Sequence, residues 1–379
     1  MIVNFSRKTV IRTLLFFFLF IVTAALSYSY FTLSRMVAPE PVSPLPQESQ
    51  TPESFDISPL PTPASASGYT ILLLGYGGPG HSGESLTDTI IAAHFEPEKR
   101  TAALISIPRD LLVPLPKDGS SVRRKINDAY ALGGGQLAKQ TVGAVIGMPI
   151  GYFVAVSFEG LKEAIDILGG VDVRVPVTFD DYYYPVVGKE NETCGKSPEE
   201  VQQILTTLSG FAIDKQFPCR FEQVHFDAGV SHMDGTTALV FVRSRHSAQH
   251  GGDFARSERA QALLVGIKDK LFSLGALDDV IPFFNRLSHS LQTDLDAETV
   301  KALLKGIGEA SEYSLTSVYL TDQNVLRSTT TGGQFVLIPK DGEGKWEGIW
   351  AFVKEQSEKN DKSGLQPTPS PKVPLKQPN

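Results

Sequence analysis

The residues best suited to chemistry in this sequence are arginines that gather in four short segments. The chain has 379 residues and a formal charge of −7, yet seven of its 15 arginines fall in these segments. Guanidinium groups match phosphate oxygens in a bidentate way, so converging arginines suit a diphosphate better than a lone carboxylate. For any one segment, a solvated surface arginine remains the alternative. The segments are Pro108–Asp110, Arg123–Lys125, Arg243–Arg245, and the pair Arg256 and Arg259.

The positions of these arginines favour a shared anion site. Arg109 directly follows an apolar run, at the kind of strand end where open α/β sheets place ligands. Arg243 and Arg245 are two apart, so both point the same way if the chain leaves a helix there and extends. Arg256 and Arg259 share a helix face near the positive end of its dipole, where cations are unfavourable unless an anion lies nearby.

Two carboxylates, Asp88 and Asp110, are the candidate ligands for a metal ion at this site. They lie at opposite ends of neighbouring predicted strands, and Mg²⁺ in proteins takes one or two carboxylates plus substrate phosphates. For Asp88 taken alone, a turn or capping aspartate is the stronger interpretation. Asp253 is interpreted as the N-cap of the helix that carries Arg256.

Several other chemistries lack sequence support. Gly75–Gly80 formally matches GxGxxG, but the next predicted strand follows too soon for the helix that a dinucleotide site requires. The sequence has no GxxxxGK[ST], HExxH or GxSxG motif. Two cysteines exclude a cysteine-based metal cluster, and the net negative charge argues against a protein that coats nucleic acid.

The elements that must position these residues alternate between strands and helices. Short apolar runs predict strands buried on both faces, and helical spacing predicts helices between them, with Ser157 as an N-cap and Gly169–Gly170 as a stop. We therefore expect an α/β layered domain. The predicted strands are Tyr69–Leu74, Asp88–Phe95, Ala102–Ile107, Tyr152–Val156 and Val171–Val175, and the predicted helices are Gln136–Ile146, Phe158–Leu168 and Asp253–Leu271.

A segment of little periodicity, Thr178–Gln223, interrupts this alternation and is interpreted as a surface insertion. It contains both cysteines, Cys194 and Cys219. A disulfide is favoured over two free thiols if the domain is exported. Closing a loop of this size would stabilise the fold by roughly 3–4 kcal/mol.

The N-terminal part predicts a membrane anchor. Thr13–Leu33 carries no charge and is long enough to cross a bilayer as a helix, and Arg7, Lys8 and Arg12 precede it. By the positive-inside rule the N-terminus is cytoplasmic and the rest is exported. A signal peptide cleaved near Ala24 is the alternative.

The expected organisation follows from these segments. Residues 1–12 form a cytoplasmic N-terminus and residues 13–33 a signal-anchor helix. Residues 34–68 form a Pro-rich stalk outside the membrane, and residues 359–379 a disordered Pro-rich tail. The folded domain is therefore expected at residues 69–358, with its chemical motifs within residues 86–271 and the insertion at about 178–223.

Six blocks in order closely resemble the LytR-CpsA-Psr family. They are LTDT (Leu86–Thr89), SIPRD (Ser106–Asp110), KINDAYALGGG (Lys125–Gly135), YFVAVSFEGLKEAIDILGGVDVRV (Tyr152–Val175), AGVSHMDGTTALVFVRSRH (Ala228–His246) and GDFARSERAQALL (Gly252–Leu264).

This resemblance implies a single-pass cell-membrane enzyme that transfers a glycopolymer, such as teichoic acid or capsular polysaccharide, from a polyprenyl diphosphate carrier to peptidoglycan. It also implies a mixed central β-sheet flanked by helices, preceded by one transmembrane helix, with an apolar groove for the prenyl chain. Asp88 and Asp110 match the family's magnesium-associated aspartates. The residues that match its diphosphate-contacting side chains are Arg109, Lys125, Arg243, Arg245, Arg256, Arg259 and Gln261.

The sequence departs from the family pattern in two places. Glycine-rich Tyr76–Glu84 stands where the family usually has Asp and Arg, so Arg123 or Arg124 is expected to substitute for one diphosphate contact. The usual Arg-Gln-Gln is here Arg259-Ala260-Gln261. A module that holds the prenyl diphosphate lipid, or regulates the cell envelope, without catalysis is the alternative function.

Overall fold

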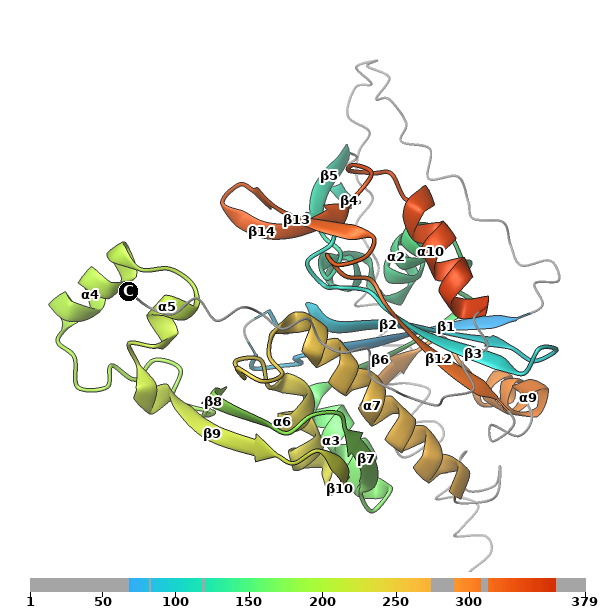
Figure 1. Ribbon diagram of the computed structural model, residues 1–379, viewed down its shortest axis with the longest axis horizontal. Helices are drawn as coiled ribbons and strands as arrows, with labels where there is room; N and C mark the ends of the chain where they lie inside the picture. The colour runs from blue at the N-terminus through green and yellow to red at the C-terminus, as the bar shows by residue number, and fades with distance from the viewer. Residues whose placement is uncertain (1–67, 82, 118–119, 274–289, 308–312, 359–379) are drawn as a thin grey trace, which may run out of the picture. The chain divides into compact units, whose positions relative to one another are not determined.

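A mixed six-stranded sheet forms the centre of the fold (Figure 1). The computed structural model describes residues 68–81, 83–117, 120–273, 290–307 and 313–358. The sheet has the strand order β11-β6-β1-β2-β3-β12. Strand β1 pairs parallel to β6, and β3 parallel to β12, while the other three pairs are antiparallel. The strands are β1 (Tyr69–Tyr76), β2 (Thr87–Glu96), β3 (Thr101–Ser106), β6 (Tyr152–Ser157), β11 (Leu291–Thr293) and β12 (Ser314–Tyr319).

Helices cover both faces of this sheet. In Figure 1, α2 and α10 lie on one side of the strands, and α3, α6 and α7 lie on the other. The helices of the described chain around the sheet are α2 (Asp128–Ile146), α3 (Phe158–Ile167), α6 (Gly235–Arg243), α7 (Gly252–Ser273), α9 (Ala297–Ile307) and α10 (Glu347–Glu358). The expected α/β class, with a mixed sheet flanked by helices, is confirmed.

Alternate strand residues are buried on opposite faces of the sheet. Leu72 and Ala92 belong to the core that includes Val142 of α2, whereas Ile91 belongs to a separate core with Ala260 of α7. Successive strand side chains point to opposite faces, so apolar residues in a row require cover on both. This is why the uninterrupted apolar runs predicted these strands.

The described residues also form four two-stranded ribbons outside the central sheet. Ribbon β7–β10 packs on α7 and belongs to a second core. The ribbons are β4 (Leu112–Lys117) with β5 (Ser120–Lys125), β7 (Val171–Val175) with β10 (Gly229–Met233), β8 (Phe179–Pro185) with β9 (Phe221–Phe226), and β13 (Leu326–Thr331) with β14 (Gln334–Pro339).

Local signals explain where two of the helices begin and end. The Ser157 side chain accepts a hydrogen bond from the Gly160 amide at 3.1 Å, which is the predicted N-cap of α3. Gly169 and Gly170 both have positive φ just after this helix and end it. Helix α2 starts earlier than expected because it continues through Gly133 and Gly134, whose non-helical dihedrals form a kink rather than a stop.

The segment expected to be a surface insertion is partly core. Phe179 of β8 and Phe226 of β9 stack with ring centroids 5.2 Å apart and are buried in the second core. Between these strands lie α4 (Pro198–Thr207), α5 (Phe211–Asp214) and the short 3-10 helix η1 (Pro218–Arg220). The expectation of a purely surface segment is therefore wrong, because Phe179 and Phe217 within it are completely buried.

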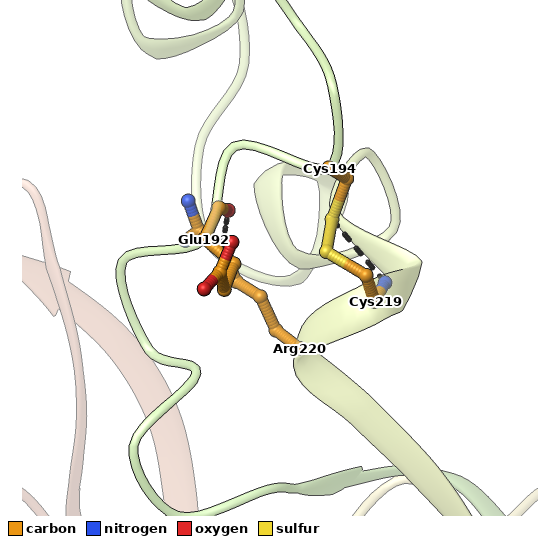
Figure 2. The surroundings of a disulfide bond; sticks show 4 residues. All are labelled: Glu192, Cys194, Cys219 and Arg220. Carbon is orange, nitrogen blue, oxygen red and sulfur yellow. Dashed lines mark hydrogen bonds between the residues drawn. A yellow bond between two sulfur atoms is a disulfide. The ribbon is translucent and has the colours of Figure 1, made fainter.

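The structure contains the disulfide that the sequence predicts between Cys194 and Cys219 (Figure 2). Their Cα atoms are 5.6 Å apart. Beside the disulfide, Arg220 Nε donates to the Glu192 carbonyl oxygen at 2.7 Å. Because Arg220 directly follows Cys219, the covalent link and the hydrogen bond fix the same two chain segments to each other.

No helix among the described residues is long and apolar enough to cross a membrane. The predicted anchor at residues 13–33 lies outside the described residues. So do residues 1–12, the stalk as far as residue 67, and the tail at 359–379.

Candidate functional site

Arg109 lies among three carboxylates just after β3. Its Nη1 donates to Asp88 Oδ1, and its Nε is 3.6 Å from both Asp110 Oδ2 and Asp253 Oδ1. The guanidinium is 21% exposed. Burial by itself lowers the pKa of Arg109, but the three carboxylates outweigh burial and raise it. Arg109 is therefore a firmly charged cation held within a ring of carboxylates.

The first turn of α7 brings Asp253 and Arg256 to the same place. Asp253 Oδ1 is 2.9 Å from Arg256 Nη2 and 3.1 Å from Arg245 Nη2. Burial opposes ionisation of Asp253, but Arg256, Arg245 and Arg109 outweigh it and lower the pKa of this carboxyl. The interpretation of Asp253 as an N-cap is wrong: α7 begins at Gly252, and the Asp253 carboxylate contacts arginines instead.

Arg256 connects α7 to strand β2. Its Nη2 donates to the Asp88 carbonyl oxygen at 2.9 Å, and its Nη1 is 3.6 Å from Asp88 Oδ1. The side chain is only 8% exposed, and burial lowers its pKa to about 10. A group with that pKa is still protonated at neutral pH, so Arg256 contributes a buried positive charge.

Lys125, the last residue of β5, completes the group. Its Nζ donates to Asp110 Oδ1 at 2.5 Å. We refer to the seven side chains together as the Arg109 cluster. Four are cationic and three anionic, so the cluster keeps one formal positive charge. Its members are Asp88, Arg109, Asp110, Lys125, Arg245, Asp253 and Arg256.

Two buried atoms in the Arg109 cluster lack a hydrogen-bond partner among the described residues. They are Arg109 Nε and Asp253 Oδ1. Both have oppositely charged atoms within 3.6 Å, but the geometry is not that of a hydrogen bond. Charge therefore holds these groups together without satisfying all of their donors and acceptors.

Arg259 and Gln261, both predicted to contact a diphosphate, contact other protein groups and not the Arg109 cluster. The Arg259 guanidinium donates to the carbonyl oxygens of Ser244 and His250 and is completely buried. Gln261 Nε2 donates to the Leu104 carbonyl oxygen at 3.0 Å and to Ser106 Oγ at 2.8 Å, and it too is completely buried. Both side chains are occupied in holding the backbone of neighbouring elements.

The remaining predicted residues, Arg243, Arg123 and Arg124, contact groups outside the Arg109 cluster. Arg243 ends α6, and its guanidinium lies 4.7 Å from the ring centroid of Phe158 and 5.8 Å from that of Tyr184. The chain does leave the helix at this point, but Arg243 and Arg245 reach different partners. Arg123, which is 69% exposed, pairs with Glu343, and Arg124 pairs with Asp128.

Sequence reasoning missed the residues that bind the backbone segment carrying Arg245. Asp181 of β8 is buried and accepts hydrogen bonds from the segment that contains Arg245. His250 Nε2 lies 2.7 Å from Glu258 Oε2, and its Nδ1 lies 3.1 Å from Arg259 Nη1. Sequence reasoning also missed the ion pair of Asp253 with Arg256, although their spacing of three residues on one helix was a usable signal for it. Nothing in the local sequence around Asp181 points to a partner more than 60 residues away.

Asp88 and Asp110 carry the type of ligand atom that a magnesium ion prefers. Both are hard oxygen donors, both contact the same guanidinium of Arg109, and Asp88 keeps 32% of its side chain exposed. No group of three or more His, Cys, Asp or Glu side chains that could hold a metal occurs in the described ranges. An ion held here would need its other ligands from water or from a substrate.

The fold and the cluster together define an α/β protein with a candidate anion site. The model of the LytR_cpsA_psr family matches residues 40–346, so the chain belongs to the LytR-CpsA-Psr family.

Two curated relatives are similar to this chain over part of their length. One is the polyisoprenyl-teichoic acid–peptidoglycan teichoic acid transferase TagU of Enterococcus faecalis, 27% identical over 62% of this chain and 64% of the relative. The other is the transferase TagV of Bacillus subtilis, 28% identical over 60% of this chain and 50% of the relative. The chain thus matches less than two thirds of the length of either one.

Solved structures show the same fold. The crystal structure of B. subtilis TagV is 24% identical, with a TM-score of 0.54 over 76% of this chain and 97% of that one. A Streptococcus agalactiae protein is 21% identical, with a TM-score of 0.56 over 79% of this chain and 91% of that one.

Proposed function

We propose that this protein is a membrane-anchored phosphotransferase that moves a glycopolymer from a polyprenyl diphosphate carrier to peptidoglycan, with assistance from Mg²⁺. The observation that carries the proposal is the Arg109 cluster, in which three arginines and a lysine surround three carboxylates. The names of the two curated relatives, both teichoic acid transferases, support the same class of reaction.

The proposed reaction is phosphoryl transfer without a covalent enzyme intermediate. A sugar hydroxyl of the acceptor attacks the phosphorus nearer the polymer, the bridging P–O bond breaks, and prenyl phosphate leaves. Arg109, Arg245 and Arg256 stabilise charge on the phosphate oxygens. The hydroxyl proton passes to a carboxylate of the site; Asp110, which Lys125 holds at 2.5 Å, is the candidate, although an aspartate that also binds a metal is a poor base.

Asp88 and Asp110 are the residues that would hold Mg²⁺. When bound, the ion supplies positive charge to the diphosphate and orients it. Arg109 contacts both carboxylates and so relates their positions in this structure.

The proposed location rests on the sequence. The uncharged run at residues 13–33, preceded by basic residues, would anchor the chain in the cytoplasmic membrane with the catalytic domain outside it. A polyprenyl diphosphate carrier lies in that membrane by its own prenyl chain, so the anchor would keep the domain near its donor.

The test is transfer by the full chain with donor, peptidoglycan fragments and Mg²⁺, followed by mass spectrometry of released prenyl phosphate. We expect Arg109→Ala and Arg245→Ala each to lower the rate by about 10²–10³-fold, the usual effect of removing one preorganised donor. Arg174→Ala, which removes an exposed arginine of β7, is the matched control and retains activity. Full activity in Arg109→Ala or Arg245→Ala would show that the site is assigned wrongly.

The same assay separates an enzyme from a non-catalytic lipid-binding or regulatory module. An enzyme releases prenyl phosphate only when Mg²⁺ and acceptor are both supplied. A binding module retains the diphosphate lipid intact under every condition, and that result would refute catalysis while leaving the diphosphate site in place.

A further inference from the structure

The segment that carries Arg245 is fixed by a buried carboxylate from a distant strand. Asp181 Oδ2 accepts hydrogen bonds from Ser244 Oγ at 2.7 Å, from the Arg245 amide at 2.8 Å and from the His246 amide at 3.0 Å. Its Oδ1 accepts a fourth from the Tyr183 amide at 2.9 Å. Asp181 is 1% exposed. The four hydrogen bonds therefore replace the water that would otherwise solvate its negative charge.

The carbonyl side of the same segment is held by a buried cation. Arg259 Nη2 donates to the Ser244 carbonyl oxygen, and Nη1 donates to the His250 carbonyl oxygen at 2.6 Å. The ring of Phe179 lies under this guanidinium, with its centroid 4.9 Å away. Asp181 therefore accepts from the Ser244 hydroxyl and the Arg245 amide, and Arg259 donates to the Ser244 carbonyl oxygen, so the Ser244–Arg245 peptide is held between two opposite charges.

A second pair keeps Arg259 in place. His250 Nδ1 lies 3.1 Å from Arg259 Nη1, and a guanidinium can only donate, so this nitrogen acts as the acceptor. The other ring nitrogen then carries the proton and donates to Glu258 Oε2, 2.7 Å away. With these two hydrogen bonds the His250 ring is held in a single orientation, and its Nδ1 in turn holds the Arg259 guanidinium in place.

The Arg245 side chain emerges from this fixed segment and reaches the Arg109 cluster. Its Nη2 is 3.1 Å from Asp253 Oδ1. Ser244, at the C-cap of α6, has already left helical dihedrals, with φ −55 and ψ 136. Asp181 and Arg259 are the charged groups that bind this backbone; the Gly252 amide also donates to the Arg245 carbonyl oxygen at 2.8 Å, and the His246 ring stacks on Phe211 with centroids 4.2 Å apart.

We propose that Asp181 and Arg259 are positioning residues that clamp the Ser244–His246 backbone and thereby aim Arg245 at the diphosphate site. The inference rests on the proposed function. It gives Arg259 a role different from ligand contact, and it makes strand β8, at the edge of the disulfide-containing insertion, part of the machinery of the site.

The test is a double-mutant cycle on ligand binding. The full chain in detergent is titrated with farnesyl diphosphate by calorimetry, for wild type, Asp181→Ala, Arg245→Ala and the double variant. We expect Asp181→Ala and Arg245→Ala each to weaken binding by about tenfold, the scale of one lost charge-assisted hydrogen bond. If Asp181 acts through Arg245, the double variant binds no more weakly than Arg245→Ala alone.

Matched variants separate positioning from general damage to the fold. Asp180→Ala removes the adjacent carboxylate, whose partners are His225 and Gln223, and should bind like wild type. Asp181→Asn keeps one acceptor oxygen and should recover part of the affinity. If Asp181→Ala does not show a cooperative thermal transition, Asp181→Asn and Ser244→Ala replace it in the cycle under the same criterion.

The possible results distinguish the two proposals. Equal losses from the Asp181 change in the wild-type and Arg245→Ala backgrounds would overturn the positioning role. Unchanged binding in Arg245→Ala would instead refute the diphosphate site itself. Non-additive losses with a wild-type-like Asp180→Ala variant support the clamp.

Discussion

Asp253 offers a direct test of how the Arg109 cluster is stabilised. Its Oδ1 lies 2.9 Å from Arg256, 3.1 Å from Arg245 and 3.6 Å from Arg109. The substitution Asp253→Asn keeps the shape of the side chain and removes its charge. The cluster then carries two formal positive charges instead of one, and Arg256, which is 8% exposed, loses its nearest anion.

The magnitude follows from burial. Removing one partner of a fully buried ion pair costs about 3–5 kcal/mol, and breaking an exposed pair costs at most about 1 kcal/mol. Asp253 is 30% exposed beside a nearly buried Arg256, so we expect a loss of about 2–3 kcal/mol, between these limits. For a domain of this size that corresponds to a decrease of about 5 °C in Tm.

The effect should depend on pH in a defined direction. The pKa of Asp253 is lowered in the fold, so its charge stabilises the fold above the ordinary carboxyl pKa and loses that contribution as the pH falls through the folded value. The difference between wild type and Asp253→Asn should therefore be full at pH 7 and shrink below about pH 4.

Thermal unfolding followed by circular dichroism measures this difference. Asp227→Asn is the control, because Asp227 is 85% exposed and its ion pair among the described residues is with a half-exposed histidine, His225. Equal Tm values for wild type and Asp253→Asn at pH 7 would refute the argument that these ion pairs hold the cluster together.

Two further predictions concern the scaffold. Replacing Cys194 and Cys219 together by Ser should lower the free energy of unfolding by roughly 3–4 kcal/mol. Reductant should lower the Tm of the wild type and leave the Tm of this variant unchanged. Equal Tm values for the oxidised wild type and the variant would contradict this prediction. Gly135→Ala should cost about 1–3 kcal/mol, because the added Cβ would lie 2.2 Å from Cε1 of Phe153. Gly151→Ala, whose Cβ would meet nothing closer than the Thr70 carbonyl oxygen at 3.7 Å, is its control, and equal Tm values for the two would contradict the steric reasoning.

The fold class was predictable because its signals are local. A strand that is buried on both faces needs apolar residues in a row, and Ser157 caps the helix that it immediately precedes. The start of α2 was not predictable from the same signals, since three consecutive glycines normally indicate a break. Here the chain resumes the helix after a kink at Gly133 and Gly134.

The candidate site was only partly predictable because an arginine's partner is decided in three dimensions. Arg256 and Arg259 are three residues apart on one helix, yet one meets carboxylates and the other meets carbonyl oxygens. Sequence spacing placed both on a shared face and could not separate these partners. The carbonyl groups of Ser244 and His250 carry no sequence signature, since every residue has one.

The arginines of the cluster also differ in how burial affects their pKa. Carboxylates raise the pKa of Arg109 despite burial, whereas burial lowers the pKa of Arg256 to about 10. A pKa near 10 still leaves roughly one molecule in a thousand unprotonated at pH 7, so the buried charge of Arg256 persists and must be compensated. Asp253 and Asp88 compensate it in this structure. The negative charge of a bound diphosphate could replace that of these carboxylates beside the guanidinium groups. Binding of a diphosphate should therefore weaken the ion pairs between the arginines and the carboxylates of the cluster.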